Sequence, residues 1–186
     1  MQANAVRKMT EEEYLALERV ADFKSEFVGG EMFAMAGGKL RHADLGARVI
    51  VEFARKLGAS CRTFNSDARV RTAKSKAYLY PDVSVVCGPV ERDQEDILLN
   101  PVVIVEVLSP STADYDHGSK FAMCREIPSF REYIMVHTEK LLIEHYTKID
   151  DGRWLLSEHE GMDGEIDLPA VSCQLSLRNI YDGAIE

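Results

Sequence analysis

Two acidic residues in the middle of the chain have types and spacing that suit a metal-dependent hydrolytic site. Asp82 opens the apolar run VSVV, and Glu106 lies inside the run PVVIVEVLS. A carboxylate in a buried strand loses hydration worth several kcal/mol. A cation shared by both acids would offset that cost. Mg²⁺ accepts one or two carboxylates and keeps several waters, so we expect Mg²⁺ here, with Mn²⁺ as a substitute.

A lysine downstream of Glu106 could complete such a site. Lys120 follows Asp116 by four residues in a predicted helix, so the two share a helix face. A nearby ammonium group would stabilise developing negative charge and position an attacking water. Judged by the helix pattern alone, a solvated ion pair worth a few tenths of a kcal/mol is the simpler interpretation.

The strand that carries Glu106 determines where this carboxylate points. Side chains alternate along a strand, so Val102, Ile104, Glu106 and Leu108 share one face. Ser109-Pro110 then ends the strand. Glu106 is therefore expected near the carboxyl end of the strand, where open α/β sheets build their sites.

The surrounding patterns predict the elements that position these residues. Met9–Val20 is expected to be a helix capped by Thr10 with Glu13 at the capping-box position, and Phe23–Met35 a hairpin around Gly29-Gly30. A helix is expected over Leu40–Leu57, with one face formed by Gly46, Val49, Ile50, Phe53, Ala54 and Leu57. The remaining expectations are strands at 61–64, 68–72, 80–87, 101–109, 131–137, 140–149 and 153–159, a helix at 113–127, and a tail with a short strand and a turn or helix. This is an α/β (α+β) fold with a mixed sheet.

Bulk properties limit the class of protein. A chain of 186 residues predicts a single domain spanning 1–186. No apolar run approaches the length of a membrane span, and the N-terminus lacks the apolar stretch of a signal peptide, so a cytoplasmic location is expected. The four cysteines show no CxxC pair, which favours reduced thiols over a disulfide framework or a zinc site. The net charge of −9 argues against broad non-specific binding to a phosphate backbone, although a local basic groove remains compatible with it.

Several motifs together resemble the Uma-two family of restriction-endonuclease-like proteins, in the PD-(D/E)XK nuclease superfamily. They are YPDVSVV, PVVIVEVLSPST, DHGSK and REYIMV, and the resemblance runs from about Met9 to Arg178. It implies a central mixed sheet flanked by helices, and a homodimer. It also implies that Asp82, Glu106 and the carbonyl of Val107 bind the metal, and that Lys120 is the catalytic lysine.

Two further segments are similar to family features. SEFVGGEM resembles an early hairpin whose acid, here Glu26, would support the metal through water or indirectly. GKLRHADLGARVIVEFARKL resembles a helix with a histidine near its start, here His42, for which a capping or surface role is the plainer alternative. One departure concerns the lysine. The superfamily pattern has Lys two residues after the second acid, where this chain has Leu108, and in this family the lysine is understood to lie on the following helix.

The sequence therefore favours a Mg²⁺-dependent endonuclease that hydrolyses phosphodiester bonds, with DNA as the expected partner. Asp82, Glu106 and Lys120 would be catalytic, and Glu26, Asp116 and His42 supporting. The main alternative is a non-catalytic binding or assembly module that keeps the nuclease fold, which the acidic charge favours. A weaker alternative is a metal-dependent hydrolase of a smaller phosphate ester.

Overall fold

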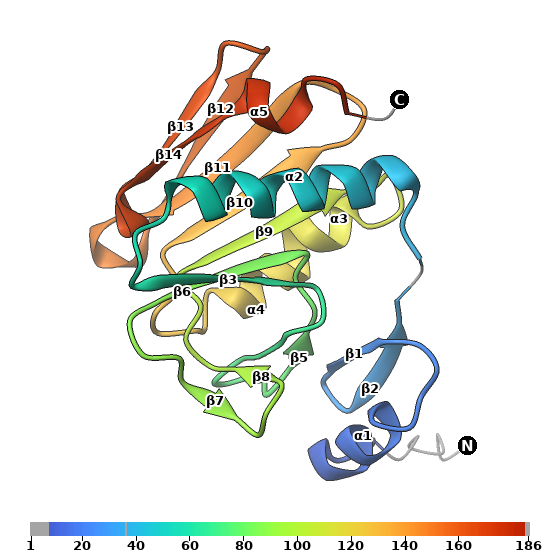
Figure 1. Ribbon diagram of the computed structural model, residues 1–186. Coiled ribbons are helices and arrows are strands. Elements are labelled where there is room, and N and C mark those ends of the chain that lie inside the picture. Colours follow the sequence, from blue (N-terminus) through green and yellow to red (C-terminus); the bar gives the residue numbers. More distant parts are fainter. Residues whose placement is uncertain (1–7, 36, 185–186) are drawn as a thin grey trace.

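A mixed six-stranded sheet forms the centre of the protein, described here by a computed structural model covering residues 8–35 and 37–184 (Figure 1). Its strands lie in the order β12-β11-β10-β9-β6-β3, and β9 and β10 are its parallel pair. The strands are β3 (Cys61–Asn65), β6 (Val83–Cys87), β9 (Val103–Leu108), β10 (Glu132–His137), β11 (Leu142–Lys148) and β12 (Trp154–Glu160). The predicted α+β class with a mixed sheet is confirmed.

Helices cover both faces of this sheet (Figure 1). The helix α2 (Leu40–Lys56) packs on the face that carries Val103 and Val105. The opposite face, with Ile104 and Leu108, is covered by a composite helix. That helix comprises α3 (Ala113–Tyr115), the π-helical turn η1 (Asp116–Lys120) and α4 (Phe121–Cys124). Strand β9 is thus buried on both faces, as its continuous apolar run predicts.

The predicted packing face of α2 was partly wrong. Ala54 is exposed, whereas Leu45 and Glu52 are buried together with Val49 and Phe53. Glu52 can be buried because its carboxylate accepts hydrogen bonds from the Ser176 N–H and the Asn179 side chain. A pattern based on apolar residues cannot detect a buried glutamate of this kind.

A second sheet, in the order β2-β1-β5-β4-β8-β7, lies beside the first and carries the N-terminal hairpin. Its elements are β1 (Ser25–Val28), β2 (Glu31–Ala34), β4 (Arg69–Arg71), β5 (Tyr78–Leu79), β7 (Arg92–Asp93) and β8 (Ile97–Leu98). The hairpin turns at Gly29-Gly30, where both glycines have positive φ. The helix α1 (Glu11–Glu18) has the predicted capping box between Thr10 and Glu13.

The C-terminal segment adds a small layer against α2. A two-stranded sheet joins β13 (Glu165–Leu168) to β14 (Cys173–Ser176), and the helix α5 (Leu177–Tyr181) follows. The short 3-10 turn η3 (Pro169–Val171) connects these two strands, and another, η2 (Asp150–Gly152), connects β11 to β12 of the central sheet. The short strand and helix expected in the tail are therefore present. Among the helices of residues 8–35 and 37–184, none has both the length and the apolar character needed to cross a membrane.

Strand register brings the two predicted acids together on two interior strands of the central sheet, β6 and β9. Strand β6 runs antiparallel to β9 with Val83 opposite Val105. Asp82, just before β6, therefore falls beside Glu106 near the carboxyl end of β9. The convergence expected from the sequence follows from this one strand pairing.

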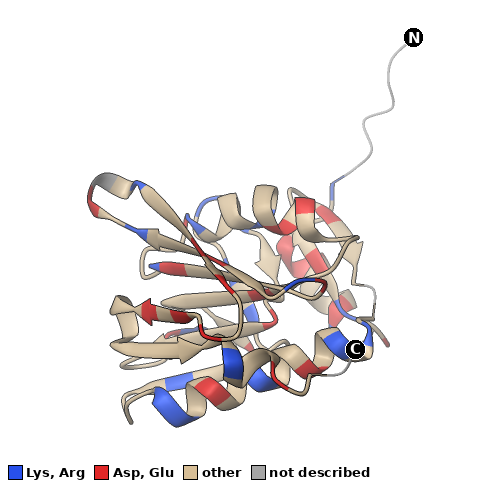
Figure 2. Cartoon of the chain, turned by 90° about the horizontal axis from the view of Figure 1, so that it is seen from above, with Lys and Arg blue, Asp and Glu red and all other residues tan. Residues whose placement is uncertain are grey.

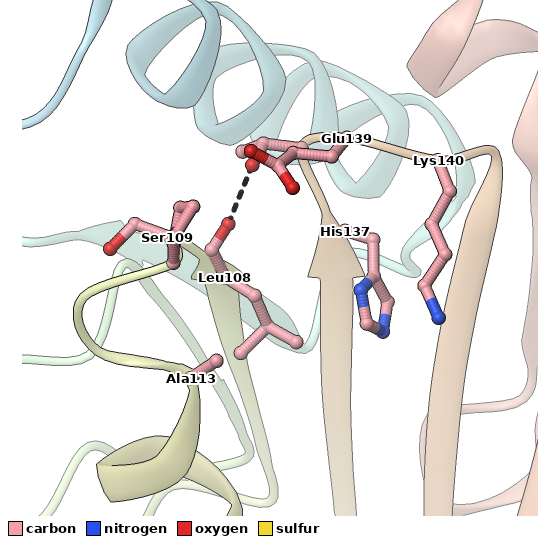
Figure 3. Close-up of a pocket in the computed structure, with 8 residues that line it drawn as sticks. Leu108, Ser109, Ala113, His137, Glu139 and Lys140 are labelled. Atoms are coloured by element: carbon pink, nitrogen blue, oxygen red, sulfur yellow. Dashed lines mark hydrogen bonds between the residues drawn. The ribbon is translucent and has the colours of Figure 1, made fainter.

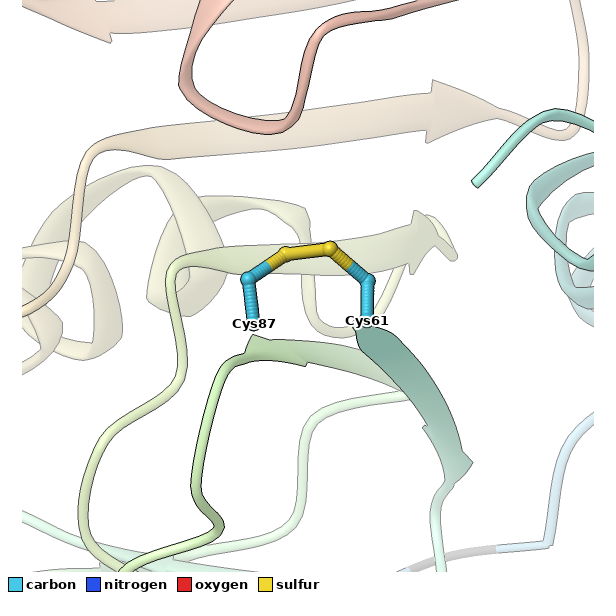
Figure 4. The surroundings of a disulfide bond; sticks show 2 residues. All are labelled: Cys61 and Cys87. Atoms are coloured by element: carbon cyan, nitrogen blue, oxygen red, sulfur yellow. A yellow bond between two sulfur atoms is a disulfide. The ribbon is translucent and has the colours of Figure 1, made fainter. Parts of the chain in front are cut away.

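Cys61 and Cys87 form a disulfide, so the expectation of reduced thiols is wrong for this pair (Figure 4). Cys61 on β3 and Cys87 on β6 are directly opposite each other in an antiparallel pair, with their Cα atoms 4.0 Å apart. A separation of 26 residues in sequence gives no sign of this register. Cys124 and Cys173 are free thiols.

Thiol counting tests this disulfide. Alkylation of the denatured protein without reductant should label Cys124 and Cys173 only, whereas reduction should expose Cys61 and Cys87 as well. Reduction should also lower the free energy of unfolding by about 2–4 kcal/mol, because it releases a closed loop in the unfolded chain. A Cys173→Ser variant is the control and should keep the response to reductant. Labelling of all four thiols without reductant would contradict the assignment.

Candidate active site

Lys120 lies at the centre of a buried cluster of carboxylates. Its Nζ is 2.9 Å from Glu106 Oε1, 3.1 Å from Glu26 Oε1 and 3.8 Å from Asp116 Oδ1. Lys120 and Asp116 are each only 4% exposed. The simpler interpretation of these two residues as a solvated surface pair is therefore wrong, because both lie inside the protein.

Three separate elements supply this cluster. Glu106 comes from the middle of the central sheet, Glu26 from the N-terminal hairpin, and Asp116 and Lys120 from the two ends of the π-helical turn η1. A π-helical turn inserted in an α-helix often marks a functional site. Here it keeps Asp116 and Lys120 on one face of the helix, directed at the sheet.

Glu26 is held by more partners than the sequence indicated. Its carboxylate accepts hydrogen bonds from the Tyr80 N–H at 3.0 Å and the Tyr115 hydroxyl at 2.7 Å, in addition to its contact with Lys120. The Tyr80 carbonyl in turn accepts a hydrogen bond from Lys120 Nζ at 3.4 Å. Glu26 thus fixes the position of Lys120.

Tyr80 and Tyr115 were missed in the sequence because neither resembles a metal ligand. Tyr80 acts through its backbone, directly before Pro81-Asp82, and its hydroxyl is anchored by Glu18 at 2.8 Å. The guanidinium of the buried Arg69 lies over its ring, 5.7 Å from the centroid. The sequence signal that could have indicated Tyr80 and Tyr115 is their position next to Pro81-Asp82 and to Asp116.

Asp82 lies at the outer side of the cluster. Its Oδ2 accepts a 2.7 Å hydrogen bond from the Val107 N–H and lies 3.3 Å from His42 Nε2. The Asp82 carboxylate raises the pKa of His42, and a hydrogen bond to the Val107 backbone contributes in the same direction. The structure thus brings His42, Asp82 and Val107 together.

The electrostatic balance of the site is strongly acidic. Burial raises the pKa of Glu106 well above its usual range, the Lys120 charge opposes this, and Asp82 and Asp116 add to it. Burial also raises the pKa of Asp116. Burial by itself would lower the pKa of Lys120, but Glu106, Glu26 and Asp116 together raise it well above its usual range, so Lys120 is an ammonium group.

The donor set of Asp82 and Glu106 fits a hard divalent cation. Glu106 Oε1 is buried and lies 2.9 Å from Lys120 Nζ, an ammonium group that it shares with Glu26 and Asp116. Within the described ranges, three or more His, Cys, Asp or Glu side chains nowhere come together in an arrangement that could hold a metal. Two carboxylates would therefore need backbone oxygen and water as further ligands, as Mg²⁺ commonly accepts.

The mixed sheet, the flanking helices and the acid–lysine cluster define a protein of the restriction-endonuclease-like class. The model of the family Uma2, described as "Putative restriction endonuclease", matches residues 11–179. The chain belongs to this family, which the sequence motifs had indicated as Uma-two, and the membership supports a nuclease-like function.

Known relatives cover nearly the whole chain. Two proteins of Synechocystis sp., both described as uncharacterized, are similar to it: slr1290 at 34% identity over 95% of this chain and 93% of that protein, and sll1609 at 37% identity over 86% and 92%. A crystal structure from Anabaena variabilis, described as a "putative nuclease belonging to DUF820", has a TM-score of 0.76 at 14% identity. It covers 94% of this chain and 98% of its own. At that identity the likeness establishes the fold.

Proposed function

We propose that this protein is a Mg²⁺-dependent endonuclease that hydrolyses phosphodiester bonds in DNA. The observation that carries the proposal is the buried cluster in which three carboxylates, those of Glu26, Glu106 and Asp116, surround the single ammonium group of Lys120. An arrangement built only for stability would pair each buried charge. An excess of buried carboxylates is the arrangement expected of a cation site.

Each residue then has a distinct role. Asp82 and Glu106 would hold the ion, with the Val107 carbonyl as a further ligand. When bound, Mg²⁺ supplies positive charge at the phosphate oxygens and favours an ionised water. Lys120, as an ammonium group, cannot act as a base. It donates hydrogen bonds to the attacking water or to a phosphate oxygen, and Glu26 and Asp116 keep it directed at the site.

Charge distribution bears on the choice between DNA enzyme and binding module. The overall charge of −9 favours a non-catalytic module that keeps the nuclease fold. Locally, however, Lys and Arg lie along α2, interrupted by acidic residues (Figure 2). His42 is also on α2, and its Nε2 lies 3.3 Å from Asp82 Oδ2. A nucleic-acid strand bound at the site would therefore pass near these basic side chains. This arrangement supports the nuclease. The cytoplasmic location is the expectation from the sequence, and the homodimer is implied by the family resemblance alone.

A cleavage assay tests the proposal. Supercoiled plasmid and single-stranded DNA are incubated with Mg²⁺, Mn²⁺ or EDTA. The wild type should cut with either metal and not with EDTA. Asp82→Asn, Glu106→Gln and Lys120→Met should each cut about 10²–10³-fold more slowly, because each removes charge that acts on the transition state.

The matched control is Glu132→Gln, which changes another fully buried glutamate on the neighbouring strand β10 and should cut like the wild type. Metal binding provides a readout independent of cutting. Mg²⁺ at 100 times its Kd should stabilise the wild type by about 2.7 kcal/mol, and Asp82→Asn should lose most of this gain. Equal cutting by all variants would refute the site. Stabilisation by metal without cutting of any DNA would favour the binding module.

A further inference from the structure

A pocket of about 360 Å³ opens beyond the carboxyl ends of β9 and β10, next to the proposed active site (Figure 3). One wall is the turn from β9 into α3, and the other is the turn from β10 into β11. The lining residues are Leu108, Ser109, Pro110, Ala113, His137, Thr138, Glu139 and Lys140. The carboxyl ends of adjacent parallel strands are where open sheets commonly bind ligands.

The pocket lies one step along the strand from the proposed metal ligands. Leu108 is two residues beyond Glu106 on β9, which places it about 6–7 Å further along the same face. The Thr138 hydroxyl donates a hydrogen bond to the Leu108 carbonyl at 2.9 Å and joins the two walls of the pocket. A nucleic-acid strand with one phosphate at Glu106 would therefore carry its neighbouring phosphate towards this pocket.

Lys140 gives one wall of the pocket a positive charge, and the imidazole of His137 lies on the same wall. In Figure 3 the side chains of His137 and Lys140 run in the same direction, whereas that of Glu139 points elsewhere. Among the described residues, Lys140 has no ion-pair partner. Ser109, on the opposite wall, contributes a hydroxyl that lies 3.0 Å from those of Ser111 and Thr112.

A buried carboxylate fixes the histidine of this wall. Glu144 bonds His137 Nε2 at 2.7 Å through one oxygen and His117 Nε2 at 2.9 Å through the other. His117 Nδ1 also faces the Ala113 carbonyl at 2.7 Å. Glu144, His117 and the Ala113 carbonyl together fix the orientation of the His137 ring. In the described part of the chain, Nδ1 of this ring has no partner.

We propose that this pocket binds a backbone phosphate adjacent to the one that is cleaved, with Lys140 as its cationic group and the Ser109 hydroxyl as a further donor. The inference rests on the proposed nuclease function and deepens it, since it assigns the path of the substrate strand. A phosphate fits because its oxygens accept hydrogen bonds from ammonium and hydroxyl donors alike. The pocket would position the strand and would carry no information about base sequence.

Binding of short oligonucleotides tests the pocket without any cleavage. Fluorescence anisotropy is measured with Ca²⁺ in place of Mg²⁺, for the wild type and Lys140→Gln, on strands in which one phosphate at a time is a neutral methylphosphonate. One position should weaken the wild type and have no further effect on Lys140→Gln. The slope of log affinity against log salt should fall by about 0.7–0.9 in Lys140→Gln. Lys148→Gln, at the other end of β11, is the matched control and should keep both properties.

The possible outcomes distinguish failure of the proposed phosphate pocket from failure of the proposed nuclease function. An equal methylphosphonate effect in wild type and Lys140→Gln would overturn the pocket, even in a protein that cuts DNA. Coupling between Lys140 and one phosphate in a protein that cuts nothing would establish the pocket and refute the hydrolytic function. Absence of oligonucleotide binding by the wild type would overturn both.

Discussion

Replacing Lys120 with Met is expected to destabilise the protein by about 3–5 kcal/mol at pH 8, the loss typical when one partner of a buried charge pair is removed. Met has similar length and fills the same space, so the change isolates the charge. Glu26, Glu106 and Asp116 would then be buried carboxylates without a cation. Chemical denaturation of wild type and variant measures the difference.

The pH dependence identifies the cause of this loss. Burial already raises the pKa of Glu106 and Asp116 above their unfolded values, and removal of the ammonium group raises both further. The folded variant therefore binds more protons than the unfolded chain, and its stability falls as pH rises above about 4.5. The penalty should be smallest near pH 5 and largest at pH 8.

Two controls support the interpretation. Lys24 forms an exposed ion pair with Asp67, and Lys24→Met should cost no more than about 1 kcal/mol. The double variant Lys120→Met with Glu106→Gln should recover part of the stability, since it removes one of the stranded charges. A penalty for Lys120→Met that is independent of pH would show that lost packing, and not charge, is responsible.

Replacing Glu132 with Gln is expected to stabilise the protein by up to about 3 kcal/mol at pH 8. Glu132 is fully buried on β10, and burial raises its pKa to about 7, against a partial opposing effect from the Ala170 N–H. Its Oε2 has no hydrogen-bond partner among the described residues. Ionisation of this group above pH 7 therefore costs stability that a neutral amide does not lose.

The protonation of Glu132 makes the stability of the wild type depend on pH. The folded protein keeps a proton on Glu132 that the unfolded chain releases between about pH 4.5 and 7, so wild-type stability falls over that range. The gain from Glu132→Gln should be near zero below pH 5 and grow by about 1.4 kcal/mol per pH unit up to pH 7. His145, whose pKa is lowered from 6.5 to about 4 by burial and by His159, gives the opposite slope between those two pH values. Its Nε2 lies 3.9 Å from Glu132 Oε2, so its contribution cancels between variant and wild type only above pH 6.5.

Glu52→Gln provides a contrasting control for the same substitution. Glu52 is as well buried as Glu132, but its oxygens accept bonds from Ser176 and Asn179. Loss of this charged acceptor should destabilise the protein by about 1–3 kcal/mol. Urea unfolding at pH 5, 6, 7 and 8 measures both variants. A gain for Glu132→Gln that is equal at every pH would contradict the protonation argument.

Local patterns in the sequence were sufficient for much of the fold. Thr10 and Glu13 define the start of α1, and the apolar run around Glu106 defines β9, because capping and side-chain alternation depend only on near neighbours. The meeting of Asp82 with Glu106 could also be anticipated, since it needs only the two long strands predicted at 80–87 and 101–109 to pair, as β6 and β9 do. The two-residue strands β5, β7 and β8 could not, because they are too short to show periodicity.

Features that depend on tertiary register or on backbone groups could not be predicted from the sequence. The Cys61–Cys87 pairing needs the register of β3 and β6, and the burial of Lys120 depends on how the composite helix packs on the sheet. The three donors to Glu26 come from different parts of the chain, and one of them is a main-chain N–H. The spacing of residues along the sequence does not predict such contacts.

The contacts of Tyr80 with Glu26 and Lys120 are both made by its peptide groups. Mutational drift at position 80 could therefore change the side chain and still leave those two contacts in place, provided that the local conformation is kept. A search for related proteins that compares residue identities would undervalue this position. A comparison of backbone traces would recover it, and designers who transplant the acid–lysine cluster into another scaffold would need to copy the path of the chain at 80 as faithfully as the charged side chains.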